Sequence, residues 1–115
     1  MIKRKSTYPV QQKEKMRGGE GTVIIEELLT PAQLYDKGRL YAKMTLSPGS
    51  SIGSHIHENE MESFYILSGE AEFCDDGEIV TLRPGDSALT PSGGSHFIKS
   101  IGDIDLEMIA LILFK

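Results

Sequence analysis

Cysteine occurs once in the 115 residues, at Cys74, so the chain cannot form an internal disulfide bond. A reducing compartment favours such a sequence, and we expect a cytoplasmic protein. Cys74 lies in the alternating run "EAEFCDD", where we expect it to pack and not to act as a nucleophile. No stretch of about 18 apolar residues is present, and the start "MIKRKSTYPV" lacks the apolar centre of a signal peptide. We therefore predict no membrane partner.

Basic residues are scarce outside the first 17 positions. Residues 1–17 carry six Lys or Arg and one Glu, a charge of +5, whereas residues 18–115 carry six against sixteen Asp or Glu, a charge of −10. A body of that charge repels nucleic acid, and no helix-turn-helix pattern is present. We predict a basic N-terminal arm over residues 1–21 and a single domain over 22–115. The arm is a solvated tail or lies on an acidic neighbouring subunit; contact with phosphate is the alternative.

Helical signals are nearly absent. In "TPAQLYDKG", Thr30 can cap a helix, Pro31 suits its first position, Gln33 completes a capping box and Gly38 can end it. Elsewhere, turn signals separate short runs of β-branched and aromatic residues, which predicts an all-β fold. We expect one short helix near residues 31–36, a strand from residue 22 onward, and strands over 39–46, 62–68, 70–75, 78–82, 86–90, 95–100 and 104–114.

Histidine occurs three times, and two of these residues stand one position apart in "HIHENEME", residues 55–62. Side chains at i and i+2 of a strand point to the same face, so His55 and His57 can converge on one point. Two imidazoles aimed together suggest a metal. Imidazole suits Zn, Cu, Fe and Ni, and a carboxylate such as Glu62 extends the range toward Mn. Glu58 and Glu60 are the alternative acidic ligands in the same loop.

The run "ESFYILS" alternates, so its residues divide between two faces. If Glu62 points inward, Phe64 and Ile66 also point inward and place an apolar wall beside the ligand, while Ser63 and Tyr65 face outward.

Two segments resemble the two motifs of the cupin superfamily. The first contains Gly49, His55, His57, Glu62 and Gly69 at the motif spacing, and the second contains Gly85, Pro91, Gly93 and His96, with Ser100 where that motif ends in Asn. All three histidines fall on motif positions, and Gly93 and Gly94 are interpreted as a turn that approaches the barrel mouth. The resemblance implies a double-stranded β-helix, a small jelly-roll barrel that holds one divalent metal ion through His55, His57, Glu62 and His96.

Four protein ligands on an ion that favours six leave two neighbouring positions for water, a bidentate anion, or substrate with dioxygen. Three His and one Glu around a divalent ion have a net charge of about +1, which attracts a small anionic ligand. Mn or Fe is our first choice, with Zn, Ni, Co and Cu as alternatives, because the same ligands accept all of them.

The resemblance implies a metal-dependent enzyme acting on a small carboxylate-bearing or oxygenated metabolite, by dioxygenase- or decarboxylase-like chemistry. A non-catalytic module that binds or senses a small anion or sugar, and a sugar-phosphate isomerase-like enzyme, are the alternatives. Glu60, with Glu58, is the candidate general base. Tyr65 and Tyr41 are candidate hydrogen-bond donors to the ligand.

Oxalate decarboxylases of this superfamily generally have two domains and an arginine three residues before the first motif histidine. That position is Ile52 here, and we do not expect oxalate decarboxylation. Arg39 or Lys43 is the alternative source of positive charge, if either points inward.

Residues 108–114, "MIALILF", are apolar on both faces of the expected strand. One face belongs to the barrel core and the other needs a cover. The strand "TVIIEELL" supplies part of that cover, from its own chain or, through the glycine joint at residues 18–21, from a partner. Strand exchange would also lay the basic arm on the acidic body of the partner. We therefore predict a homodimer.

Overall fold

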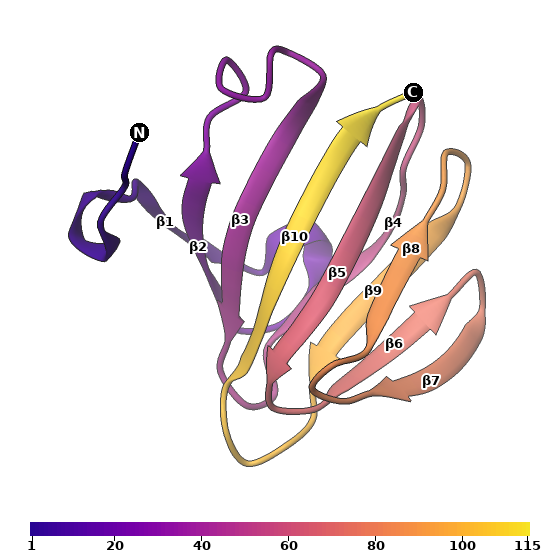
Figure 1. The fold of residues 1–115 in the computed structure, drawn as a ribbon. Coiled ribbons are helices and arrows are strands. Elements are labelled where there is room, and N and C mark those ends of the chain that lie inside the picture. Colours follow the sequence, from indigo (N-terminus) through magenta and orange to yellow (C-terminus); the bar gives the residue numbers. More distant parts are fainter.

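The computed structural model describes residues 1–115 as two antiparallel β-sheets that face each other (Figure 1). The larger sheet has the strand order β1-β2-β3-β10-β5-β8, and the smaller has the order β4-β9-β6-β7. The strands are β1 (Val10–Glu14), β2 (Thr22–Leu29), β3 (Gly38–Leu46), β4 (Ser51–Ile56), β5 (Glu60–Ser68), β6 (Ala71–Asp75), β7 (Glu78–Leu82), β8 (Ser87–Thr90), β9 (Ser95–Ser100) and β10 (Leu106–Phe114). Two short 3₁₀ turns, η1 (Lys5–Thr7) and η2 (Met16–Gly18), flank β1. The predicted all-β fold is confirmed.

The core lies between the two sheets and comes from the alternation of the strands. On β5, Phe64 and Ile66 are buried on the same face as Glu62, as the sequence predicts, and Tyr65 faces outward. Phe64 meets Phe73 of β6 edge to face, with ring centroids 6.2 Å apart. Burying one face of each strand fixes the register, because a slip of one residue would expose these side chains.

Two strands are absent from the sequence prediction. β1, "VQQKE", is exposed at every position and has no apolar alternation that could reveal it. β4, "SIGSHI", contains two serines and a glycine, which are poor strand formers. Each is a strand because its neighbour supplies backbone partners, β2 for the first and β9 for the second.

The helix predicted near residues 31–36 is wrong; the segment is a series of hydrogen-bonded turns. The capping box itself forms, since Gln33 N donates to Thr30 Oγ1 (3.2 Å) and Thr30 N donates to Gln33 Oε1 (3.0 Å). Tyr35 and Asp36 then adopt left-handed backbone angles, with φ of 55° at each. A helix cannot continue through that conformation, so only its first turn forms.

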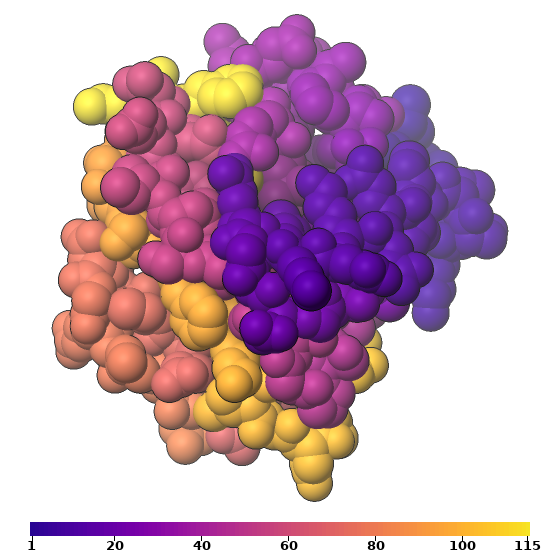
Figure 2. All heavy atoms as spheres, turned by 180° about the vertical axis from the view of Figure 1, so that it is seen from behind, coloured from indigo at the N-terminus to yellow at the C-terminus, as the bar shows by residue number.

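The predicted arm lies on the barrel of its own chain. β1 pairs with β2 from Val10↔Glu26 to Glu14↔Thr22, and Lys3 Nζ donates to Leu28 O (2.8 Å). The space-filling view shows this N-terminal segment, in indigo, crossing the back of the molecule (Figure 2). None of the structure's helical segments has the length and apolarity needed to cross a bilayer.

The outer face of the six-stranded sheet is the place to test the homodimer, which stays a prediction. Ile109 and Leu111 of β10 are only partly covered, and Ile109 lies opposite Tyr65, which is 48% exposed. An apolar sheet face of this kind favours association with a second copy. We expect sedimentation at micromolar concentration to give a dimer, and Leu111→Glu to shift it to a 12.7 kDa monomer. A wild-type monomer would contradict this prediction, and dissociation on deleting residues 1–21 would instead assign the contact to the arm.

Candidate metal centre

Three strands and one loop bring the four predicted ligands together. His55 lies on β4, Glu62 on β5 and His96 on β9, and His57 follows β4 directly. His55 and His96 are direct partners across the β4–β9 pair. The backbone of His57 is held by the loop before β9, where Gly93 N donates to His57 O (2.6 Å) and His57 N donates to Gly94 O (3.0 Å). All four ligand atoms lie within 4.8 Å of one another.

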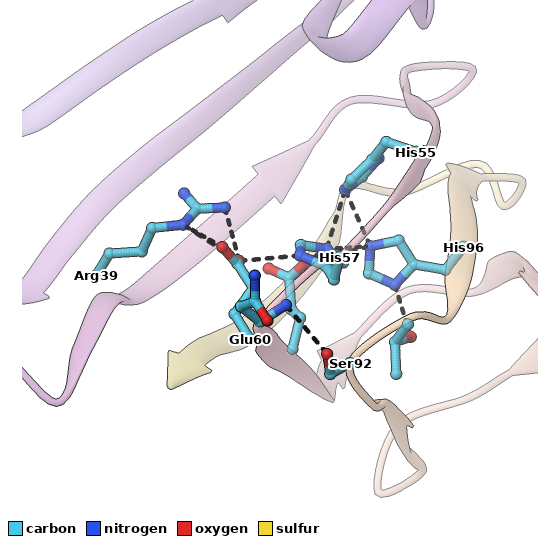
Figure 3. A network of polar contacts seen from close by, with 9 residues as sticks. Arg39, His55, His57, Glu60, Ser92 and His96 are labelled. Atoms are coloured by element: carbon cyan, nitrogen blue, oxygen red, sulfur yellow. Dashed lines mark hydrogen bonds and ion pairs between the residues drawn. The ribbon is translucent and has the colours of Figure 1, made fainter. Parts of the chain in front are cut away.

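The three imidazoles direct their Nε2 atoms at a single point (Figure 3). The Nε2–Nε2 distances are 3.1 Å for His55–His57, 3.0 Å for His57–His96 and 3.1 Å for His55–His96. Glu62 Oε1 lies 2.9 Å from His57 Nε2 and 3.1 Å from His96 Nε2. No ion pair joins Glu62 to His55, so these two approach the point from opposite sides.

Each histidine is oriented by a partner at its other ring nitrogen, Nδ1. His55 Nδ1 donates to Gly53 O (2.7 Å), His57 Nδ1 donates to Glu60 Oε2 (3.0 Å), and His96 Nδ1 lies 2.9 Å from Thr90 Oγ1. A carbonyl and a carboxylate only accept, so Nδ1 of His55 and of His57 is protonated, and in the neutral form of each ring Nε2 presents a lone pair. Such outer partners fix the ring orientation that a metal ligand requires.

The cavity beside these ligands has a volume of about 510 Å³. It lies between the N-terminal arm and the strands that carry the ligands, and His55, His57 and Glu62 form part of its wall. Its other charged lining residues are Lys13, Arg17, Glu27 and Arg39. Ile52, buried and three residues before His55, lies in the same wall.

Comparison with known proteins places this geometry in a family. Residues 42–112 match the cupin domain, which is more than half of the chain. The chain is a cupin. It is 44% identical over 113 residues to an oxalate-binding protein of Thermotoga maritima, an alignment that covers 98% of this chain and 93% of that protein. The crystal structure of a predicted oxalate decarboxylase from Thermotoga maritima superposes with a TM-score of 0.96, at 43% identity and with full coverage of both chains.

Part of a larger relative also aligns with this cupin. Quercetin 2,3-dioxygenase of Bacillus subtilis is 30% identical over 103 residues, which is 76% of this chain and 29% of the enzyme. This cupin therefore corresponds to less than a third of that protein.

The environment of the candidate ligands shifts their pKa values in different directions. Burial lowers the pKa of His55, and the positive charge of Arg17 adds to this effect. The hydrogen bond to Glu62 raises the pKa of His57. Burial acts to raise the pKa of Glu62, but hydrogen bonds from His57 and His96 outweigh it and lower that pKa below 4.5.

Neither candidate catalytic side chain lines the cavity. Glu60 lies behind His57, where Arg39 Nε and Nη2 bind its carboxylate (2.9–3.2 Å) and Nδ1 of His57 donates to it. Burial acts to raise the pKa of Glu60, but these contacts outweigh it and lower that pKa. Such a carboxylate orients His57 and is a poor base. Tyr65 is on the outer face of β5, opposite in direction to Glu62.

Three of the other sequence candidates also lie away from the cavity. Glu58 is exposed, Tyr41 is only partly covered, and neither is among the lining residues. Lys43 pairs with Glu107 (3.5 Å) outside the cavity. Arg39 does line it, as the sequence analysis allowed, but its guanidinium is bound to Glu60.

Proposed function

We propose that this cupin binds one divalent metal ion through His55, His57, Glu62 and His96 and uses it to bind oxalate or a similar small dicarboxylate. One observation carries the metal assignment: Nε2 of His55 and Nε2 of His57 lie 3.1 Å apart, where both present lone pairs when the rings are neutral. Lone pairs at that distance repel unless a proton or a cation lies between them. Three imidazoles and a carboxylate around one point supply the donors that a transition metal prefers.

The ligand spacing supports six-coordination. With metal–ligand bonds of about 2.1 Å, neighbouring corners are about 3.0 Å apart in an octahedron and about 3.4 Å apart in a tetrahedron. The distances between neighbouring ligand atoms in this site are 2.9–3.1 Å. An octahedral arrangement favours Mn or Fe over a tetrahedral Zn site.

His55, His57, Glu62 and His96 would hold the ion, and an ion that favours six ligands would keep two positions for other groups. Two oxygens of a dicarboxylate would fill those positions. When bound, the ion acts as a Lewis acid toward such oxygens, and its net charge with these ligands is about +1.

The identity of the dicarboxylate rests on the relatives. The Thermotoga maritima protein, aligned over nearly the whole chain, is an oxalate-binding protein. Within this chain, the basic side chains Lys13, Arg17 and Arg39 line the cavity, so an anion is favoured over a neutral sugar.

Catalysis is the second candidate, as a decarboxylase- or dioxygenase-like reaction on the same ligand. The relative described as a predicted oxalate decarboxylase favours it. Against it, Glu27 is the one acidic lining residue besides Glu62. Ile52 offers no group for proton transfer. We therefore place binding first.

Calorimetry on the Mn-loaded protein tests this proposal. We expect oxalate to bind with one molecule per chain, acetate to bind at least 10-fold more weakly because it offers one carboxylate, and the chelator-treated protein to bind neither. Formate should not accumulate during incubation with oxalate. Equal oxalate binding with and without metal would contradict the proposal, and steady formate release would assign the decarboxylase reaction instead.

A further inference from the structure

The N-terminal arm forms one wall of the metal-site cavity. Lys13 of β1 and Arg17 of η2 line the cavity together with His55 and His57. The indigo arm lies against the magenta residues of the barrel in the space-filling view (Figure 2). The arm therefore contributes to the site although it carries no metal ligand.

The arm is fixed there by close backbone contact with β4. A side chain at Gly53 would come within 2.0 Å of Arg17 O, and one at Gly19 within 2.3 Å of Ser51 O, so both positions require glycine. Ser51 N donates to Glu20 O (2.8 Å), and Glu20 N donates to Ser51 Oγ (2.8 Å). Gly53 also holds His55 through its carbonyl oxygen, so one residue connects the arm to the first ligand.

The charged side chains of the cavity differ in whether they have an ion-pair or hydrogen-bond partner. Glu62 is engaged by His57 and His96, and Arg39 is engaged by Glu60 in a two-pronged contact. Lys13 and Arg17 make no ion pair or side-chain hydrogen bond in the structure. Glu27, the other acidic lining residue, is not paired with either of them.

Arg17 owes its position to an unusual backbone conformation. Lys15 and Arg17 both have left-handed angles, with φ of 50° and 54°. Non-glycine residues adopt this conformation at a cost, and it persists where surrounding contacts hold it. Here the contacts are those of Gly19 and Glu20 with Ser51 of β4 and of the Arg17 backbone with Gly53 of β4, and the resulting turn keeps Arg17 in the cavity wall.

We infer that Arg17, assisted by Lys13, is the anion-recognition element of this site and binds the carboxylate oxygens that the metal leaves free. The inference rests on the proposed function and adds the residues that set the preference of the site for a doubly charged ligand. An Arg guanidinium suits this task, because its planar donors match a carboxylate in two-pronged geometry. The inference also assigns the basic arm a role that involves no nucleic acid.

Paired double variants test the inference. Lys13→Gln/Arg17→Gln and the control Arg4→Gln/Lys5→Gln each remove one Lys and one Arg from the arm, but Arg4 and Lys5 do not line the cavity. In calorimetry with oxalate on Mn-loaded protein, we expect the Kd of the first variant to rise by about 10- to 100-fold and that of the control to change less than about 2-fold. Metal content and thermal midpoint should match the wild type in both, and Arg17→Lys should give an intermediate Kd.

An unchanged Kd in Lys13→Gln/Arg17→Gln, with wild type binding oxalate, would overturn the inference and leave the proposed function in place. An equal rise in the control would also overturn it, because the total charge of the arm would then be responsible. If the metal-loaded wild type does not bind oxalate, the proposed function fails and the inference fails with it.

Discussion

Replacing His55 and His57 together by alanine is expected to lower the metal content from one ion per chain to almost none. The double variant keeps only Glu62 and His96, whose ligand atoms lie 3.1 Å apart. Two protein ligands do not hold a divalent ion through purification, and loss of even an outer partner costs about 10- to 100-fold in affinity. Elemental analysis after gel filtration in metal-free buffer measures the change.

A milder variant and a folding measurement distinguish a loss of metal binding from a loss of folding. Thr90→Val removes the partner of His96 Nδ1 and keeps all four ligands, so it should weaken metal binding by about 10- to 100-fold without abolishing it. The double variant should retain the circular-dichroism spectrum of the wild type, because the core between the sheets contains neither His55 nor His57. One metal ion per chain in a folded double variant would rule out this assignment.

Three of the candidate ligands could be predicted from residues that lie close together in the sequence, whereas His96 was named because it falls on the second cupin motif. His55 and His57 stand two residues apart, and Glu62 begins an alternating strand whose apolar positions show which face is buried. Eight of the ten strands could be predicted from the same kind of local alternation, and β1 and β4 could not. The short helix was wrong because a capping box specifies only the first turn, and the backbone of Tyr35 and Asp36 then turns left-handed.

The groups around the ligands could not be predicted, because they depend on the register between distant strands. Thr90 reaches His96 since β8 pairs with β5 in a register that sets Thr90 opposite Glu62. Arg17 reaches the cavity through contacts between the arm and Gly53, and nothing in a run of charged residues indicates where the arm will lie. The glycines at positions 19 and 53 were the available signal for that close approach.

Acidification is expected to release the metal, from full occupancy at about pH 7.5 to almost none at about pH 4. Only a neutral imidazole coordinates, so protons compete with the metal at each histidine. The hydrogen bond to Glu62 raises the pKa of His57 above 6.5, so protons compete for His57 already near neutral pH. The lowered pKa of Glu62 keeps its carboxylate ionised over most of this range, so the loss comes from the histidines.

The metal-free protein should respond to pH in a different way, and the contrast provides the measurement. The raised pKa of His57 contributes stability that is complete below pH 6.5 and is lost as pH rises through the folded-state pKa. The lowered pKa of Glu62 contributes stability that is complete above pH 4.5 and is lost as pH falls through its folded-state pKa. Their shared interaction therefore stabilises the metal-free form most fully between pH 4.5 and 6.5.

Thermal midpoints measured with and without Mn should converge as pH falls. At about pH 7.5 bound metal stabilises the folded state, and this gain disappears when the ion is released. The variant His55→Ala/His57→Ala should show no effect of Mn at any pH, which separates metal release from a general effect of acid on the barrel. A wild-type protein that keeps both its metal and its Mn-dependent midpoint at about pH 4 would show that neutral histidines do not hold the ion, because a free imidazole, whose ordinary pKa is about 6.5, is protonated at that pH.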